Sequence, residues 1–399
     1  MTRTVFRGGT LFDAVSKSAT VADIAVEDGR IAAVGTGLDG DTEVDCAGRG
    51  ILPGLFDCHV HLTMSSTDLF HIAQEPFSVQ FYEGALNMAK TLACGITTVR
   101  DAAGADHGMR VAQERGMIPG PRMRVSLNML SQTGGHGDPW WPSTCVMDLL
   151  PAHPGRPPVV VDGPEQIRHK IRELVRAGAD VIKVATSGGL VSSGAGPRIA
   201  HFRDDEIAMM VSEASAAGLH VMAHANADGA KAAVRNGVRS IEHGNHLDDE
   251  TLAMMAERGT WLVPTLSAGL GLRRAIEGGE QYPDHVLAKI EESGGSSVAR
   301  AVRAGVPIAM GTDTPLIPHG ENLTELRLLV DEGLTPAQAL HAATLSAAEL
   351  MGLDAELGSL EPGKRADLVL VDGDPLDIDD LSGRIRTVYQ DGHAVHRRA

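Results

Sequence analysis

The sequence predicts an α/β protein in which a (β/α)₈ TIM barrel is joined to a small β-sandwich domain formed by both chain termini. Two observations lead to this prediction. In the middle of the chain, a unit made of an amphipathic helix, a glycine and a short apolar run recurs. Near both ends, short segments instead alternate apolar and polar residues, which is typical of antiparallel strands with one solvated face.

The recurring unit reads, for example, KTLACGITTVRD, RELVRAGADVIKVAT and ARAVRAGVPIAMGTD. A glycine at the end of a helix can adopt the left-handed conformation that terminates it. The apolar runs that follow are those of parallel strands covered on both faces. With further strands expected at 51–58 and 122–130, about eight strands alternate with helices, which is the pattern of a (β/α)₈ barrel. The glycines of the unit are Gly95, Gly178, Gly218, Gly237, Gly259 and Gly305.

An open, doubly wound sheet is the alternative to a barrel. Such folds commonly carry a glycine-rich dinucleotide fingerprint after an early strand, and this sequence has none there. The terminal segments, which include TVADIAVEDGRIAAVG and VYQDGHAVHR, show hairpin signals. We therefore expect a β domain built from residues 1–50 and 353–399, with the barrel at 51–352 between them.

Composition excludes several classes of protein. The chain has 399 residues, 43% of them hydrophobic and 22% charged, as in ordinary globular proteins. Its net charge of −17 argues against a nucleic-acid partner, since phosphates require a basic face. We find no signal-peptide pattern and no run of about 18 apolar residues, so we expect no membrane partner and a cytoplasmic location. No C-x-x-C spacing occurs, and we expect buried thiols at Cys46, Cys58, Cys94 and Cys145.

The segment GLFDCHVHL (54–62) places two histidines at the end of an apolar strand. Side chains alternate along a strand, so His59 and His61 point to the same face. With 17 histidines in the chain, roughly 0.7 His-x-His pairs are expected by chance. The pair is therefore either accidental or part of a metal site that uses nitrogen ligands.

Other strands of the expected barrel also end in polar residues, namely Lys183, His224, His243 and Asp313. The carboxyl ends of barrel strands meet at one rim, so these side chains should converge with the histidine pair. A single histidine or a helix-capping aspartate would be unremarkable. Lys183 is harder to dismiss, because a buried ammonium costs several kcal/mol or loses its proton. Together the six residues suit two divalent ions of the zinc kind.

These residues stand in the segments DCHVHL, TTVRDAAG, TGGHGD, IKVATSGG, SIEHG and GTDTP, and the tail reads GSLEPGKRADLVLVDGDP. In these motifs, and over almost the whole chain, the sequence resembles the amidohydrolase superfamily. The resemblance is to its binuclear branch of metal-dependent dipeptidase-like and imidazolonepropionase-like hydrolases. It implies one metal, most simply Zn²⁺, on His59, His61 and Asp313, a second on His224 and His243, and a carboxylated Lys183 bridging both.

The resemblance also implies a mechanism. A hydroxide bridging the two metals would attack an amide carbonyl, because bound metals make water acidic. Asp313 would orient this hydroxide, take its proton and pass it to the leaving amine. His136, in the loop TGGHGD, is our candidate donor to the developing oxyanion, and an ordinary loop histidine is the alternative. Arg100 has no role that the sequence indicates.

The expected substrates are dipeptides or N-acyl amino acids, including aromatic acyl amides. A cyclic amide, a carbamate or a urea is the alternative, and an inactive barrel that serves as a binding subunit is a third reading. A homo-oligomer is expected from the relatives. Many dipeptidase relatives hold the substrate carboxylate with a tyrosine where this chain has Asn226, so a carboxylate requirement is open. The expected substrate contacts, for which ordinary packing is the alternative, are Trp140, Trp141, Arg198, Asn226 and His319.

Overall fold

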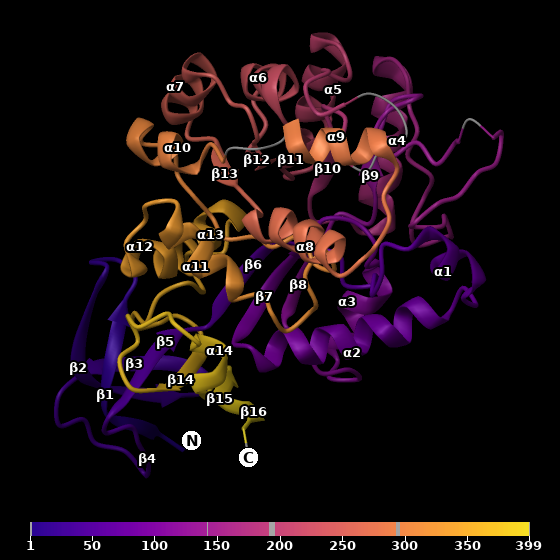
Figure 1. Ribbon diagram of the computed structural model, residues 1–399. Helices are drawn as coiled ribbons and strands as arrows, with labels where there is room; N and C mark the ends of the chain where they lie inside the picture. The colour runs from indigo at the N-terminus through magenta and orange to yellow at the C-terminus, as the bar shows by residue number, and fades with distance from the viewer. Residues whose placement is uncertain (1, 142, 191–195, 293–295, 399) are drawn as a thin grey trace.

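The computed structural model describes residues 2–141, 143–190, 196–292 and 296–398. The central strands form two parallel sheets that together make most of a ring (Figure 1). One sheet contains β6 (Leu55–Val60), β7 (Ile96–Asp101) and β8 (Arg122–Val125). The other contains β9 (Met129–Leu130), β10 (Ile182–Ala185), β11 (Val221–Ala225), β12 (Ser240–His243) and β13 (Trp261–Val263).

Two irregular segments close the ring. Residues 122–130 pair with β7 at one end and with β10 at the other, and Leu127, with φ 68°, separates β8 from β9. Residues 307–314 fill the eighth position between β13 and β6. There Ala309 N donates to Leu262 O (3.0 Å), and Cys58 N donates to Met310 O (2.8 Å). Eight strand positions therefore close, and the predicted (β/α)₈ barrel is confirmed.

Helices cover the outside of this ring (Figure 1). The predicted glycines all have positive φ, between 66° and 96°, as left-handed helix terminators require. No helix in the described part of the chain is long and apolar enough to cross a membrane. The helices that follow the earlier strands are α1 (Leu69–Gln74), α2 (Val79–Ala93), α3 (His107–Glu114), α4 (Pro164–Ala177), α5 (Asp204–Ala216), α6 (Ala227–Arg235) and α7 (Asp249–Arg258).

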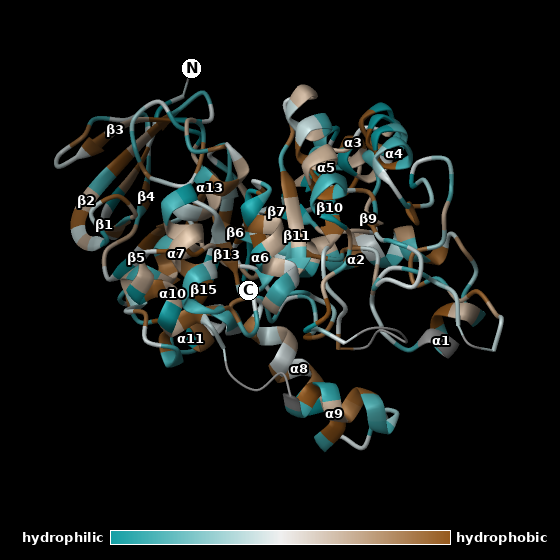
Figure 2. Ribbon diagram, turned by 90° about the horizontal axis from the view of Figure 1, so that it is seen from above, coloured by the Kyte–Doolittle hydropathy of each residue, from teal (hydrophilic) through white to brown (hydrophobic). Residues whose placement is uncertain are grey.

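After β13 the chain makes an excursion of two helices, α8 (Leu266–Glu277) and α9 (Asp284–Glu292), which project from the rest of the molecule in Figure 2. It then returns through α10 (Val298–Ala304) to the eighth strand position. The remaining helices are α11 (Thr324–Asp331), α12 (Pro336–Ala342), α13 (Leu345–Met351) and α14 (Leu381–Arg384).

Both chain ends build one eight-stranded sheet, as predicted, with order β16-β15-β14-β5-β1-β2-β3 and β4 paired to β1. The two ends join where β5 pairs antiparallel with β14, and Leu52 lies opposite Val369. Phe6, Ile24 and Leu368 are buried in its core. Its strands are β1 (Thr4–Asp13), β2 (Ser18–Glu27), β3 (Arg30–Gly35), β4 (Thr42–Asp45), β5 (Arg49–Pro53), β14 (Leu368–Asp372), β15 (Ile385–Gln390) and β16 (His393–Arg397).

The strand predicted at 51–58 is instead two strands that belong to different sheets. β5 joins the terminal sheet and β6 joins the barrel, with Gly54 between them. A Cβ at position 54 would lie 2.2 Å from Thr97 Oγ1, so only glycine lets the chain pass there. The terminal sheet thus includes residues 49–53, and the proposed division at 1–50, 51–352 and 353–399 otherwise stays a prediction.

The cysteines follow the expectation with one exception. Cys46, Cys58 and Cys94 are buried free thiols, as predicted. Cys145 is exposed, and the prediction was wrong there. The reason is local: Trp141 N donates to Cys145 O (3.0 Å) in a tight turn, which a surface loop places in solvent.

Candidate metal centre and active site

The six predicted metal ligands come together at the carboxyl-terminal rim of the barrel. Asp313 Oδ1 lies 3.1 Å from His61 Nε2 and 3.4 Å from His59 Nε2. Lys183 Nζ lies 3.4 Å from His59 Nε2. The centroid of the His243 ring lies 5.1 Å from that of His59. Residues from five different strand positions thus share one centre, as expected from parallel strands.

His224 completes the group, since its ring centroid lies 4.4 Å from that of His243. His59, His243 and Asp313 offer ligand atoms that all lie within 4.8 Å of one another. Imidazole nitrogens together with a carboxylate are the donors that zinc-like ions prefer. The residues present therefore fit divalent metal ions.

Burial sets the protonation of three of these histidines and of Lys183. It lowers the pKa of His59 and of His224 well below the ordinary value and that of His243 to about 4. These imidazoles are therefore neutral at pH 7, which is the form that binds metals. Burial also lowers the pKa of Lys183 to about 8, so part of this lysine is a neutral amine near neutral pH.

A buried ion pair orients His59. Its Nδ1 lies 2.8 Å from Glu242 Oε2. Arg100 Nη2 donates to both carboxylate oxygens of Glu242, and Arg100 Nε donates to Cys58 O (2.7 Å). A carboxylate that holds one ring nitrogen directs the other toward a metal. This gives Arg100 the role that the sequence did not indicate.

Two of the other histidines, His61 and His243, are held by uncharged groups. His61 Nδ1 donates to Ala103 O (2.8 Å), and His243 Nδ1 lies 2.6 Å from Thr265 Oγ1. In both rings these contacts at Nδ1 leave Nε2 to face the centre. His243 has φ 69° and Thr265 has φ 48°. Left-handed backbone is unfavourable for such residues, and it accompanies ligand positioning in many sites.

Asp57 ties the two strand ends that carry His59 and Asp313. It accepts hydrogen bonds from His59 N (3.1 Å), Thr312 Oγ1 (2.6 Å) and Asn322 Nδ2 (2.8 Å). Burial raises its pKa to about 6. Sequence reasoning missed the roles of Asp57 and Glu242, although each is a charged residue inside an apolar strand beside a predicted ligand. A charged residue at such a position in the sequence is the signal that could have indicated their roles.

His136 lies against the centre. Its ring stacks on that of His224, with centroids 4.2 Å apart and planes at 29°. A Cβ on Gly189 would lie 2.3 Å from this ring, so the glycine makes room for it. Burial lowers the pKa of His136 to about 3, which leaves a neutral imidazole that can donate one N–H. The loop TGGHGD, which follows the third strand of the barrel, thus brings His136 next to the candidate metal centre.

Two of the expected substrate contacts are engaged within the protein. Asn226 Nδ2 donates to Ser187 Oγ (3.3 Å), and Asn226 Oδ1 accepts from Asn245 N (2.9 Å). His319 is 7% exposed and donates from Nε2 to Met64 O (3.0 Å). Both side chains tie loops of the rim together. Their geometry favours a structural role over direct contact with substrate.

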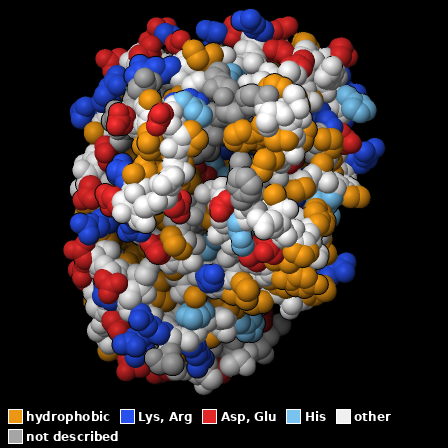
Figure 3. Space-filling view, turned by 45° about the vertical axis from the view of Figure 1, so that its right-hand side comes forward, with side chains coloured by type: hydrophobic (Ala, Val, Ile, Leu, Met, Phe, Trp, Pro, Cys, Tyr) orange, Lys and Arg blue, Asp and Glu red, His pale blue; other side chains and the backbone are white. Residues whose placement is uncertain are grey.

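The other expected contacts are on the surface. Trp140 is 51% exposed and pairs with Val146 across a short hairpin, four residues after His136. Trp141 is partly buried in the same hairpin. Arg198 is exposed and contacts His246. On the face seen in Figure 3, hydrophobic side chains gather around a hollow near the centre of the view, and charged side chains of both signs lie around its edge.

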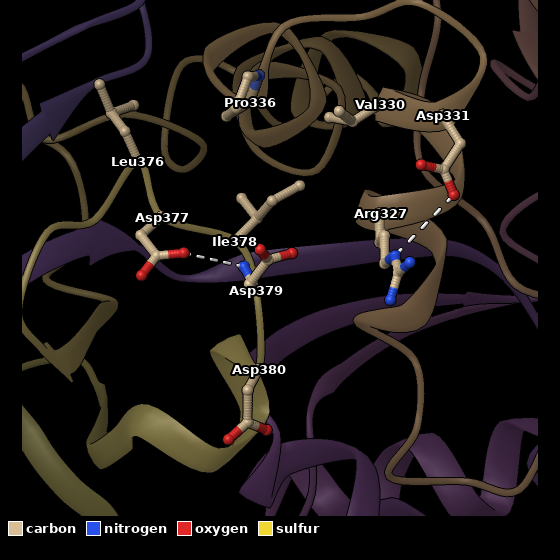
Figure 4. A pocket seen from close by; sticks show the side chains of 9 residues that line it. All are labelled: Arg327, Val330, Asp331, Pro336, Leu376, Asp377, Ile378, Asp379 and Asp380. Carbon is tan, nitrogen blue, oxygen red and sulfur yellow. Dashed lines mark hydrogen bonds and ion pairs between the residues drawn. The ribbon is translucent and has the colours of Figure 1, made fainter.

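A separate pocket of about 480 Å³ lies between α11 and residues 376–380 (Figure 4). Its wall carries the carboxylates of Asp377, Asp379 and Asp380, and Arg327 faces Asp331 at 3.9 Å. None of the predicted site residues lines it. The centre at the barrel rim is therefore the candidate active site.

The amidohydrolase family model matches residues 51–395. The chain belongs to the amidohydrolase family. It is 34% identical to the ochratoxinase of Aspergillus niger over 343 residues, which cover 82% of this chain and 71% of that protein. It is 28% identical to the imidazolonepropionase of Rhizorhabdus wittichii over 389 residues, which cover 88% and 87% of the two chains.

Solved structures agree with this membership. A prolidase complexed with N-methylphosphonate-L-proline matches with a TM-score of 0.91 and 34% identity, over 100% of both chains. The crystal structure of A. niger ochratoxinase matches with a TM-score of 0.87 and 30% identity, over 98% of this chain and 95% of that one. The protein is thus a metal-dependent amidohydrolase that hydrolyses C–N bonds, and both its family and its split β domain were correctly predicted.

Proposed function

We propose that this amidohydrolase cleaves the amide bond of dipeptides or N-acyl amino acids, including those with aromatic acyl groups. The observation that carries the proposal is the stacking of His136 on His224, beside Asp313 and the other ligand-type side chains. A possible hydrogen-bond donor and a carboxylate thus lie near the same group of histidines, which supports the proposal. The likeness to a prolidase and to an ochratoxinase supports the substrate class.

The metal ligands are proposed as follows. His59, His61 and Asp313 would hold one ion, His224 and His243 a second, and Lys183 would bridge them. We propose Zn²⁺ for both. Bound ions of this kind supply an acidified water and polarise a carbonyl oxygen.

Lys183 can bridge only after modification, since an ammonium cannot bind a cation. Its neutral amine would add to the carbon of carbon dioxide, forming a carbamate and releasing one proton to solvent. The anionic carbamate would then offer two oxygen atoms as metal ligands in place of the single amine nitrogen. The lowered pKa of Lys183 favours this reaction, because only the neutral amine attacks.

The chain's own groups then divide the chemistry. Asp313, with a side chain that is 14% exposed, would accept the proton of the attacking water and deliver it to the leaving amine nitrogen. His136 would donate its N–H to the carbonyl oxygen as negative charge develops there. Trp140, Val146 and Ile199 are large exposed apolar side chains on loops after β9 and β10, and they would pack against an acyl group.

Hydrolysis of a cyclic amide, carbamate or urea is the second candidate function. The observation that favours it is the likeness to an imidazolonepropionase. A cytoplasmic location and a homo-oligomer also stay proposals.

The test of the proposed function is a panel of dipeptides, N-acyl amino acids and cyclic amides assayed with the zinc-reconstituted protein, alongside metal analysis. We expect up to two ions per chain, hydrolysis of linear amides, loss on chelation and recovery with Zn²⁺. Turnover of cyclic amides alone would contradict the proposal, and a metal-free inactive protein would favour a binding subunit.

A further inference from the structure

The N-terminus of α8 is capped by a residue of another helix. Glu325, in the first turn of α11, accepts hydrogen bonds from Leu266 N (2.9 Å) and from Ser267 N (2.7 Å). The hydroxyl of Ser267 donates to the same carboxylate. These backbone N–H groups belong to the first turn of α8, where a helix offers them no partner of its own. Glu325 therefore takes the place of the N-cap side chain of α8.

The residue at the N-cap position of α8 is Thr265, a type that commonly caps a helix itself. Its side chain makes no capping bond with α8, all of whose residues the structure describes. It has φ 48° and ψ 47°, a left-handed backbone that is unfavourable for a β-branched residue. Its hydroxyl instead lies 2.6 Å from His243 Nδ1. Thr265 thus holds a proposed metal ligand, and the capping of α8 falls to Glu325.

This use of Glu325 has an energetic cost. Its side chain is fully buried, and among the described residues no lysine, arginine or histidine nitrogen lies within 4.0 Å of its carboxylate. A carboxyl group buried without a cation is more costly to desolvate than a threonine hydroxyl. Capping by Thr265 itself would avoid this cost. The arrangement is explained if the Thr265 hydroxyl is required by His243.

The same end of α11 also reaches the other proposed ion position. Asn322, three residues before Glu325, donates from Nδ2 to Asp57 (2.8 Å). Asp57 in turn accepts a hydrogen bond from His59 N (3.1 Å). The short segment 322–325 therefore contacts the groups that support a proposed ligand of each ion.

We propose that Glu325 is a positioning residue of the metal centre, acting on His243 through Thr265. By capping α8, Glu325 leaves the Thr265 hydroxyl to accept the Nδ1–H of His243, which directs His243 Nε2 toward an ion. Without Glu325, the unsatisfied N–H groups of α8 would compete for this hydroxyl. The inference rests on the proposed function, since it requires His243 to be a metal ligand.

Zinc affinity, measured by competition with a chromogenic chelator, tests this inference without relying on turnover. Thr265→Val should lower the affinity by about 10- to 100-fold, the range for losing the partner of a metal-binding histidine. Glu325→Met keeps the length of the side chain and should lower it by about 10-fold, the lower end of that range, because it acts through Thr265. Glu325→Gln keeps one acceptor oxygen and should lose less. Thr265→Ser keeps the hydroxyl and should recover most of the loss seen in Thr265→Val.

A double variant shows whether the two residues act in series. Thr265→Val/Glu325→Met should bind zinc as weakly as Thr265→Val alone, because Glu325 then has no hydroxyl to act through. Losses that add in the logarithm of the affinity would overturn the inference, as would an unchanged affinity in Glu325→Met. If Glu325→Met does not fold, Glu325→Gln supplies the same comparison.

Thr335→Ala is the matched control. Thr335 caps α12 by accepting a hydrogen bond from Gln338 N (3.2 Å), so this variant also loses a helix cap. It should bind zinc as the wild type does. With Co²⁺ in place of zinc, visible absorption reports on ligand geometry, and it should change in Glu325→Met but not in Thr335→Ala. Equal effects in these two variants would reduce Glu325 to a general stability role and overturn the inference.

The failure of this inference differs from that of the proposed function. If the wild type binds zinc but hydrolyses no member of the substrate panel, the proposed function fails, and the zinc titrations still decide the role of Glu325. If His243→Ala binds zinc as the wild type does, His243 is not a ligand, and the inference is overturned whatever the substrate.

Discussion

The Nδ1 atom of His59 lies 2.8 Å from Oε2 of Glu242, and neither side chain is more than 1% exposed. Glu242 is in turn paired with Arg100, whose Nη2 lies 2.9 Å from its Oε1. Because the carboxylate holds one ring nitrogen, it fixes the tautomer and the direction of the other. The buried pair thus links the stability of the barrel to the geometry of the candidate metal centre.

Glu242→Gln should lower zinc affinity by about 10- to 100-fold, because the amide holds the imidazole without the negative charge that makes it a better ligand. Competition with a chromogenic chelator measures this affinity. Glu257→Gln, at an exposed position of α7, is the control and should bind zinc as the wild type does. Unchanged affinity in Glu242→Gln would show that the contact is only structural.

Arg100→Met should destabilise the fold by about 3–5 kcal/mol, since it leaves the Glu242 carboxylate buried without its partner. Urea denaturation of the metal-free protein measures the free energy of unfolding. The double variant Arg100→Met/Glu242→Gln should be more stable than the sum of the single losses implies, with a coupling of about 0.5–3 kcal/mol. Strictly additive losses would contradict the pairing.

Lys183→Ala should lose the metal pair and nearly all activity, because the proposed bridge is gone. Lys183→Met keeps most of the buried apolar volume and should lose metal equally, which separates a ligand from a packing residue. Elemental analysis and assays with and without added acetate or bicarbonate measure both effects, and partial rescue by these small anions is expected. Two ions bound to Lys183→Met would remove the bridging role.

His136→Ala should lower kcat by about 10²–10³, the range for losing one donor to a developing oxyanion. The kcat/KM value should fall in parallel, since the interaction strengthens only in the transition state. Zinc content should stay unchanged, and His393→Ala, at an exposed site in β16, should behave as the wild type. Loss of zinc would instead make His136 part of the metal site, and an unchanged kcat would exclude it from catalysis.

Glu325 should make stability depend on pH. It is fully buried, accepts hydrogen bonds from Leu266 N (2.9 Å) and Ser267 N (2.7 Å), and burial raises its pKa to about 7. The folded state therefore holds a proton between pH 4.5 and 7 that the unfolded state releases. The contribution of the protonated Glu325 carboxyl to the free energy of unfolding is complete below the unfolded-state pKa. This contribution is lost as the pH rises through about 7, the folded-state pKa.

The slope from this one group is at most about 1.4 kcal/mol per pH unit. Glu325→Gln should remove it, so the difference in unfolding free energy between wild type and variant should change with pH in this window. Urea titrations of both metal-free proteins at pH 5, 6, 7 and 8 measure the difference. A difference that is constant across these values would show that Glu325 does not titrate there.

The sequence by itself determined the barrel, the pairing of the two ends and the convergence of the six ligand-type side chains. These follow from local rules: glycines end helices, apolar runs become covered strands, and parallel strands place their carboxyl ends at one rim. His59, Lys183 and Asp313 could be assigned to this rim because each stands at the end of a recognisable strand. The position of His136 also followed, since its loop comes directly after such a strand.

Only the tertiary structure decided which partners these residues meet. Arg100 and Glu242 are 142 residues apart, and Asp57 and Thr312 are 255 apart, so no local pattern connects them. The split of residues 51–58 between two sheets depends on Thr97 lying against Gly54, which is also a non-local contact. Asn226 and Arg198 were equal candidates for substrate binding in the sequence. The fold distinguishes them, because neighbouring loops engage the amide of one and leave the guanidinium of the other exposed at the rim.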